Sequence, residues 1–188
     1  MTRAPALTDQ TVATIAARIT RPVVLVGLMG AGKSTVGRRL AALLKRDFVD
    51  ADDAIAEAAG RSIPEIFESF GEAYFRDGER RVIARLMDEA HGVIATGGGA
   101  FVDPATRALI LDRGIAVWID CAVETLVERT AKRTNRPLLR NGDPKEILTR
   151  LARERTPFYA EAPIRVLSEN GPHADTARAI LEAIDQWL

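Results

Sequence analysis

The stretch Gly27-Leu-Met-Gly-Ala-Gly-Lys-Ser-Thr35 decides the fold of this chain, because it matches the pattern G-x-x-x-x-G-K-[S/T]. In this pattern the glycines allow a tight turn, so that backbone N–H groups point at phosphate oxygens without hindrance from a Cβ atom. The lysine brings positive charge to the β- and γ-phosphates, and the serine hydroxyl can coordinate magnesium. We therefore predict a nucleoside triphosphate site made by Gly30, Ala31, Gly32, Lys33, Ser34 and Thr35.

The residues on either side of this loop support the same prediction. Val23-Val-Leu-Val26 is a short β-branched run, typical of a strand that is buried on both faces of a sheet. After the loop, Val36, Leu40 and Leu44 recur at helical spacing. A helix that begins near Ser34 would turn the positive end of its dipole toward the phosphates. The alternative interpretation is a glycine-rich turn without function. The buried strand before the loop and the helix after it argue strongly against that interpretation.

Further apolar runs alternate with helix-like segments along the rest of the chain. This alternation predicts an α/β fold with a parallel five-stranded sheet and helices on both faces. We expect strands at 23–26, 48–49, 93–95, 115–119 and 164–167. We expect helices at 34–46, 52–59, 64–90 with a break near Gly71, 104–112, 122–133, 144–160 and 174–187.

The N-terminal residues 1–20 form an extension that we separate from a single domain at 21–188. Within the extension, residues 8–19 have an amphipathic pattern that predicts a helix. A frayed extension without a functional role is an equally good interpretation.

Composition and charge argue against several classes of protein. The chain has 188 residues, with 26 basic and 26 acidic side chains, so its formal net charge is zero. A balanced charge argues against a surface built for nucleic acid, and no apolar run approaches the ~20 residues of a membrane span. The single cysteine, Cys121, excludes an internal disulfide. Because the N-terminus also lacks the apolar core of a secretion signal, we expect a cytoplasmic protein.

Two aspartates follow the second predicted strand, at the edge where ligands bind in open α/β sheets. Asp50 would lie near Ser34 and reach magnesium, while Asp52 would face an acceptor and accept a hydrogen bond from its hydroxyl. Capping of the next helix is the alternative role for Asp52 and for Asp53. The motifs do not specify the reaction, but the absence of N-K-x-D and D-x-x-G segments argues against a GTPase switch and favours a small kinase.

Gly97-Gly98-Gly99 follows the third predicted strand and must lie at the same edge of the sheet. Three successive glycines lose much conformational entropy on folding, so we favour close approach of a ligand to this backbone over a flexible turn. A planar guanidinium can grip a carboxylate with two hydrogen bonds. Arg76, three residues before Glu79, and Arg155, near the end of a predicted helix, are candidates, although sequence patterns do not separate them from the other arginines.

Residues 134–144, Thr-Asn-Arg-Pro-Leu-Leu-Arg-Asn-Gly-Asp-Pro, carry helix-breaking signals between two predicted helices. A functional lid that bears Arg136 and Arg140 and a plain surface loop are both compatible with this pattern. His91 and His173 stand beside Gly or Pro in predicted loops, so we expect both to be exposed.

Taken together and in this order, the motifs above make the chain resemble the shikimate kinase family. The resemblance runs from about Val23 to the C-terminus and leaves the extension outside it. The segments that carry it are 27–35, 48–55, 60–67 with 71–79, 96–100, 135–139 and 155–159. It implies a P-loop fold like that of nucleoside monophosphate kinases, with a mobile lid at about 134–144. It also implies transfer of the γ-phosphoryl group of ATP to the 3-hydroxyl of shikimate, giving shikimate 3-phosphate and ADP in aromatic amino acid biosynthesis.

Matched position by position, the resemblance implies roles in phosphoryl transfer. Lys33 would touch phosphate, and Ser34 with Asp50 would hold Mg²⁺. Asp52 would engage the hydroxyls of the substrate ring and take part in catalysis. Arg136 would come in with the lid toward the transferring phosphate.

The resemblance also implies the residues that bind the rest of each ligand. Arg76 and Arg155 would clamp the substrate carboxylate, and the backbone of Gly97-Gly98-Gly99 would approach the substrate. Arg129, helped by the loop near Asn170, would pack on adenine.

Two alternatives stay open at this stage. One is a different specificity on the same scaffold, such as a gluconate or nucleotide kinase. The other is a regulator that binds ATP without consuming it. Our prediction is a monomeric kinase whose partners are shikimate and ATP.

Overall fold

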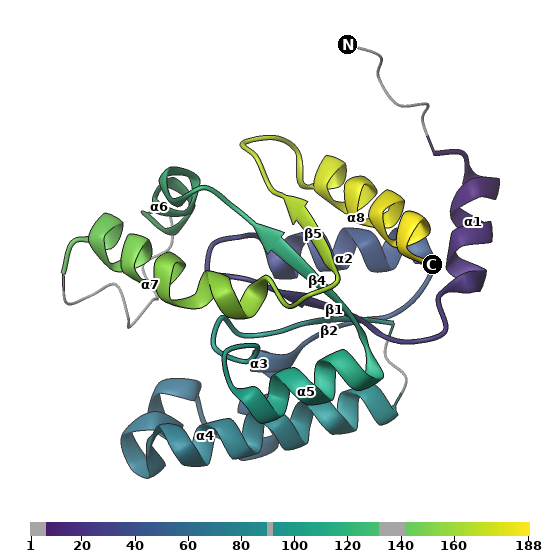
Figure 1. The fold of residues 1–188 in the computed structure, drawn as a ribbon. Coiled ribbons are helices and arrows are strands. Elements are labelled where there is room, and N and C mark those ends of the chain that lie inside the picture. The colour runs from purple at the N-terminus through teal and green to yellow at the C-terminus, as the bar shows by residue number, and fades with distance from the viewer. Residues whose placement is uncertain (1–6, 90–91, 132–141) are drawn as a thin grey trace.

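A central sheet lies between two layers of helices in this computed structural model, which describes residues 7–89, 92–131 and 142–188 (Figure 1). Within these parts of the chain, five parallel strands follow the order β2-β3-β1-β4-β5. The strands are β1 (Val23–Val26), β2 (Phe48–Asp50), β3 (Val93–Ala95), β4 (Ile115–Asp120) and β5 (Ile164–Leu167). The predicted five-stranded parallel sheet is confirmed.

Strand β1 occupies the centre of the sheet. Val23 lies opposite Val93 of β3 on one side and opposite Ile115 of β4 on the other. All four residues of β1 are buried, as expected for a β-branched run that is covered on both faces. Because every strand is parallel, the loops that follow their carboxyl ends lie along one edge of the sheet.

The helices cover both faces of the sheet, with α2 and α8 on one side and α4 and α5 on the other (Figure 1). Helices α6 and α7 pack against each other. The helices in the described residues are α1 (Asp9–Arg18), α2 (Lys33–Leu44), α3 (Ala51–Ala59), α4 (Ile63–Asp88), α5 (Pro104–Arg113), α6 (Val123–Ala131), α7 (Pro144–Tyr159) and α8 (His173–Trp187).

Local sequence signals explain where α4 starts and where it bends. Ser62 accepts a hydrogen bond from the backbone of Glu65, whose carboxylate in turn accepts one from the Ser62 N–H at 2.8 Å, so the two residues form a capping box. Gly71 has non-helical backbone angles (φ 80°, ψ 175°) and kinks the helix. The break that we predicted near Gly71 is confirmed.

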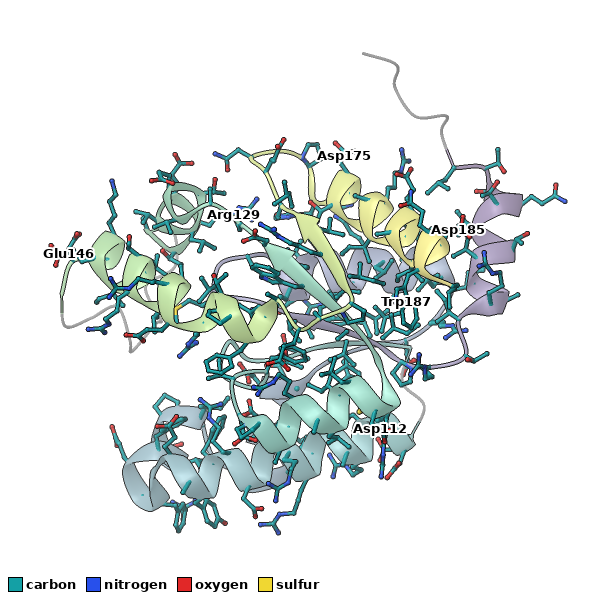
Figure 2. The ribbon with its side chains drawn as sticks, in the orientation of Figure 1. Asp112, Arg129, Glu146, Asp175, Asp185 and Trp187 are labelled. Carbon is teal, nitrogen blue, oxygen red and sulfur yellow. The ribbon has the colours of Figure 1, made fainter. Side chains whose placement is uncertain are left out.

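Helix α1 packs against α2 and α8 beside the C-terminal end of the chain (Figure 1). Ile15 and Ile19 are buried in the main hydrophobic core. Arg18 forms an ion pair with Asp185 of α8, which Figure 2 labels. The Arg46 guanidinium donates hydrogen bonds to the carbonyl oxygens of Ala16 (3.0 Å) and Ile19 (2.6 Å), and so holds the end of α1 in place. These contacts make α1 part of the packed core rather than a frayed end.

Some sequence predictions fall on residues 90–91 and 132–141, which lie outside the described residues. They include His91, Arg136, Arg140 and most of the predicted lid at 134–144. In the rest of the chain, no helix combines the length and the apolar character that a membrane crossing requires.

Candidate active site

A cavity of about 470 Å³ opens at the carboxyl edge of the sheet. Its lining comes from the loops after β1, β3 and β5, from the end of β2, from the first turns of α2, α3 and α8, and from α6. The predicted site residues that line it are Gly30, Gly32, Lys33, Ser34, Thr35, Asp50, Asp52, Gly97, Gly98, Arg129 and Asn170. Residues that we had assigned to a donor and to an acceptor from separate segments therefore surround one space.

The loop between β1 and α2, at 27–32, is called the phosphate loop below, and it folds around the side chain of Lys33. Gly30 and Gly32 have positive φ angles of 83° and 94°, a conformation that L side chains rarely adopt. The buried Lys33 ammonium donates hydrogen bonds to the carbonyl oxygens of Gly27 (2.7 Å) and Leu28 (2.8 Å). Because Lys33 is also the first residue of α2, its charge lies at the positive end of that helix. The arrangement favours a polyanion.

The Asp50 carboxylate joins this loop to the next helix. Its Oδ2 accepts a hydrogen bond from Ser34 Oγ at 2.5 Å, and its Oδ1 accepts one from the backbone N–H of Asp52 at 3.0 Å. Asp50 is thus the residue that caps α3, a role that we had considered for Asp52 and Asp53. Two hard oxygen donors meet beside the phosphate loop, which suits a small divalent cation that keeps phosphate oxygens as further ligands.

Each glycine of the loop at 97–99 faces at least one polar side chain from another part of the chain. A Cβ atom on the first glycine would lie 2.8 Å from Asp52 Oδ1, and one on the second would lie 3.2 Å from Arg155 Nη1. A Cβ atom on the third would overlap the Arg76 guanidinium. None of the three has a positive φ, so glycine is required for space rather than for conformation. We predicted close approach of a ligand here, and the structure adds that the protein's own side chains approach as well.

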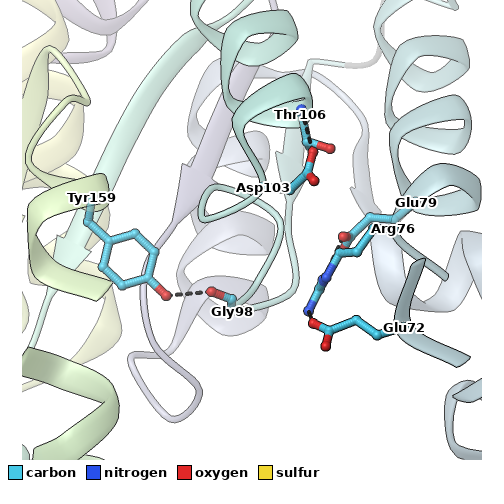
Figure 3. A network of polar contacts seen from close by, with 7 residues as sticks. All are labelled: Glu72, Arg76, Glu79, Gly98, Asp103, Thr106 and Tyr159. Carbon is cyan, nitrogen blue, oxygen red and sulfur yellow. Dashed lines mark hydrogen bonds and ion pairs between the residues drawn. The ribbon is translucent and has the colours of Figure 1, made fainter. Parts of the chain in front are cut away.

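The Arg76 side chain lies between two acidic residues of its own helix, α4 (Figure 3). Its Nη1 donates to Glu79 Oε2 at 2.7 Å, and its Nη2 lies 3.4 Å from Glu72 Oε1. The predicted pairing of Arg76 with Glu79 is confirmed. Glu79 is 0% exposed, and its Oε1 has no hydrogen-bond partner among the described residues. Burial raises the pKa of Glu79 to about 7, against the opposing effect of Arg76.

Asp52 is half-buried and lines the cavity. Burial raises the pKa of Asp52 above its ordinary value, and the neighbouring Asp50 carboxylate raises it further. The positive charge of Lys33 acts in the opposite direction. A carboxylate with a raised pKa holds a proton more readily, which suits a group that receives one during a reaction.

Arg129 connects the phosphate loop to the loop that follows β5. Its Nη1 donates to the carbonyl oxygen of Ala31 at 3.2 Å, and its Nη2 donates to that of Glu169 at 2.8 Å. Asn170, next in the chain, donates to Glu128 of α6 at 3.2 Å. Arg129 thus lies beside the phosphate loop, and both predicted residues line the cavity.

Sequence reasoning missed two residues of this region. His173, which we expected to be exposed, is half-buried and lines the cavity, with its ring against Gly32. Tyr159 donates a hydrogen bond from Oη to the carbonyl oxygen of Gly98 at 2.5 Å (Figure 3). The only available signal was that Tyr159 comes four residues after Arg155 on a predicted helix, which places the two on one face.

Comparison with known proteins points to one family. A model of the shikimate kinase family matches residues 29–185. A shikimate kinase of Novosphingobium aromaticivorans is 64% identical over 178 residues, which cover 93% of this chain and 92% of that protein. A shikimate kinase of Caulobacter vibrioides is 55% identical over 166 residues, with 88% and 83% covered.

Solved structures agree with these sequence matches. The shikimate kinase of Acinetobacter baumannii, solved in complex with shikimate, superposes with a TM-score of 0.85 at 41% identity, covering 92% of this chain and 97% of that one. A gluconokinase from Sinorhizobium meliloti superposes with a TM-score of 0.60 at 16% identity, covering 90% and 94% of the two chains. The second likeness is one of fold alone.

Proposed function

This chain belongs to the shikimate kinase family, and we propose that it transfers the γ-phosphoryl group of ATP to the 3-hydroxyl of shikimate, giving shikimate 3-phosphate and ADP. One observation carries the proposal: Lys33 and Asp52 line the same cavity, beside a glycine loop that two arginines flank. A donor phosphate and a hydroxylated acid can therefore meet there. The reaction belongs to the pathway that leads to aromatic amino acids.

The phosphate loop would bind the donor. Its positive-φ glycines turn the backbone N–H groups toward the phosphates, and Lys33 adds a full positive charge. Phosphoryl transfer proceeds through a largely dissociative transition state, so the protein contributes mainly positioning and charge neutralisation. The carbonyl groups that hold Lys33 keep that charge in place before the nucleotide arrives.

Ser34 and Asp50 would hold a magnesium ion together with phosphate oxygens. Their oxygen atoms already lie 2.5 Å apart, and hard oxygen donors in small number are what Mg²⁺ takes from proteins that bind nucleotides. When bound, the ion would neutralise charge on the β- and γ-phosphates.

The acceptor would be held by its carboxylate. Arg76 and Arg155 lie against the glycine loop from α4 and α7, and a guanidinium offers paired N–H donors to a carboxylate. Charge-assisted hydrogen bonds are worth about 1.5–3 kcal/mol each, so these two residues would dominate the affinity for the acid.

Asp52 would orient the attacking hydroxyl and receive its proton. As the new O–P bond forms and the bond between the γ-phosphorus and ADP breaks, the hydroxyl proton passes to an Asp52 carboxylate oxygen. The transfer would be late, because the transition state is dissociative. The raised pKa of Asp52 supports this role.

Other predicted assignments remain part of the proposal. Arg129 and Asn170 would contact the nucleotide, which their position in the cavity supports. Arg136 would reach the transferring phosphate, and it lies outside the described residues. We also propose that the protein works as a monomer in the cytoplasm, without a nucleic-acid partner; gel filtration of the purified chain tests the first point.

A panel of acceptors with MgATP tests the function. We expect ADP release with shikimate, measured in a coupled assay, to exceed that with gluconate, a nucleoside monophosphate or no acceptor. An analogue of shikimate that lacks the carboxylate should bind at least about tenfold more weakly. Preference for gluconate or a nucleotide would show a different specificity. ATP binding without consumption under every condition would show a regulator instead of an enzyme.

A further inference from the structure

The loop at 97–99 is shaped partly by its own backbone. Ala100 N–H donates to the Gly97 carbonyl at 3.2 Å, and Val102 N–H donates to the Gly99 carbonyl at 3.1 Å. These two turns engage the first and third carbonyls of the glycine run. The carbonyl of Gly98 takes part in neither turn and accepts its hydrogen bond from outside the loop.

Tyr159 is the donor of that hydrogen bond. Its hydroxyl donates to the Gly98 carbonyl oxygen at 2.5 Å, and the residue is only 1% exposed (Figure 3). The ring packs near Trp118 of β4, with centroids 6.0 Å apart. A buried ring has few alternative orientations, so the position of the hydroxyl that donates to the loop is fixed.

The geometry of the peptide unit extends the effect to Gly99. The Gly98 carbonyl and the Gly99 N–H belong to one planar trans peptide, so they point in opposite directions. When Tyr159 fixes the carbonyl, it also fixes the N–H. Gly99 is the glycine against which the Arg76 guanidinium lies. One hydroxyl thus orients a backbone donor next to an arginine of the acceptor site.

The same tyrosine lies beside the second arginine. Arg155 precedes Tyr159 by one helical turn in α7, and its Nη1 would lie 3.2 Å from a Cβ atom on Gly98. Burial raises the pKa of Tyr159 above its ordinary value, with the Arg155 guanidinium acting in the opposite direction. The phenol therefore stays protonated at neutral pH and keeps its hydrogen to donate.

We propose that Tyr159 is a positioning residue of the acceptor site, whose hydroxyl holds the Gly98–Gly99 peptide in the orientation that receives the substrate carboxylate between Arg76 and Arg155. This inference rests on the proposed function. The competing explanation is that the hydroxyl merely satisfies a buried carbonyl. That explanation predicts loss of stability without a selective effect on the acid substrate.

The variant Tyr159→Phe removes one hydroxyl and keeps the ring that packs near Trp118. We expect its KM for shikimate to rise about three- to tenfold, as for the loss of one neutral hydrogen bond, while its KM for ATP stays within about twofold. The matched control is Tyr74→Phe on α4, whose residue is 55% exposed and which should behave as wild type. An unchanged KM for shikimate, or equal changes for both substrates, would overturn the inference.

A second measurement does not depend on the variant at Tyr159. The chain has only two tyrosines, so protein labelled with ¹³C at the tyrosine Cζ gives two resonances, and Tyr74→Phe identifies which belongs to Tyr159. Saturating shikimate should shift the Tyr159 resonance, and the absence of a shift would refute the role. If wild-type protein fails to phosphorylate shikimate at all, the proposed function falls; if it does so and Tyr159 is insensitive, only this inference falls.

Discussion

The phosphate loop and the glycine loop at 97–99 lie on the same edge of the sheet, yet their glycines serve different purposes. In the phosphate loop, Gly30 and Gly32 are needed for their positive φ angles, and we propose that the loop binds phosphate through its backbone and one adjacent lysine. At 97–99 the backbone is ordinary, and glycine is needed because side chains of α3, α4 and α7 lie against it.

The two loops belong to different halves of the proposed site: a donor half for the nucleotide and an acceptor half for shikimate. The two halves differ in how many separate segments of the chain contribute to them. We assign most of the donor half, which would bind the nucleotide phosphates, to nine consecutive residues at 27–35, so a short motif predicts it. The acceptor half is assembled from segments that are distant in sequence, and each contributes a single side chain. Variants should therefore separate the two halves, and the following predictions test that separation in order of decreasing effect.

Replacing Lys33 with alanine should affect the donor half most strongly. Loss of the charge beside the γ-phosphate is expected to lower turnover by roughly a thousandfold or more. Shikimate affinity, measured by isothermal titration without nucleotide, should stay within a few-fold of wild type. Turnover above a tenth of the wild-type value would remove the role that we give Lys33.

Replacing Arg76 with alanine should affect the acceptor half. We expect the KM for shikimate to rise at least about tenfold, because a charge-assisted contact is lost, while ATP affinity is nearly intact. Arg81→Ala is a suitable control, since Arg81 lies on the same helix with 71% of its side chain exposed. An equal loss of ATP binding in a folded Arg76→Ala protein would show that the two halves are not separate.

Gly99→Ala tests whether space is what the glycine loop supplies. The added Cβ would overlap the guanidinium of Arg76, which is the far end of a flexible side chain and can move. The protein should fold, but the displaced arginine should raise the KM for shikimate about threefold to tenfold. Gly78→Ala on α4 meets nothing within 4 Å and should leave KM unchanged. A wild-type KM for Gly99→Ala would contradict our account of the loop.

The buried Glu79 predicts a pH dependence of stability. Its pKa is raised to about 7 in the folded protein, whereas the ordinary value is 4.5. Between these pH values the folded state holds a proton that the unfolded state has lost, so the free energy of unfolding should fall as pH rises, by at most about 3 kcal/mol. Urea unfolding at pH 5 and pH 8 measures this fall. Glu79→Gln cannot titrate there, and an identical fall in this variant would assign the effect to other groups.

Much of the fold follows from local patterns. The strands, the phosphate loop and the kink at Gly71 each depend on residues close in sequence, and the structure places them where the patterns predict, with helix ends that differ by one or two residues. The pairing of Arg76 with Glu79 is equally local, since both lie on one helical face.

What could not be predicted depends on distant contacts. His173 is covered because its ring meets Gly32, a residue from the other end of the chain. The loop at 97–99 signals a close approach, but nothing in its sequence says which side chain each glycine receives. The capping role went to Asp50 and not to its neighbours because Asp50 ends β2, a boundary that the apolar pattern placed one residue earlier.

The attachment of α1 limits how far this protein can be shortened. Trimming the first twenty residues would leave the Arg46 guanidinium without its two carbonyl acceptors. It would also remove Ile15 and Ile19 from the hydrophobic core and expose the surfaces of α2 and α8 that α1 covers. Helix α2 begins at Lys33, so its C-terminal end is the end far from the proposed nucleotide site. Weaker packing at that end would therefore have little effect on the position of Lys33. A trimmed enzyme should accordingly lose heat tolerance before it loses catalytic rate.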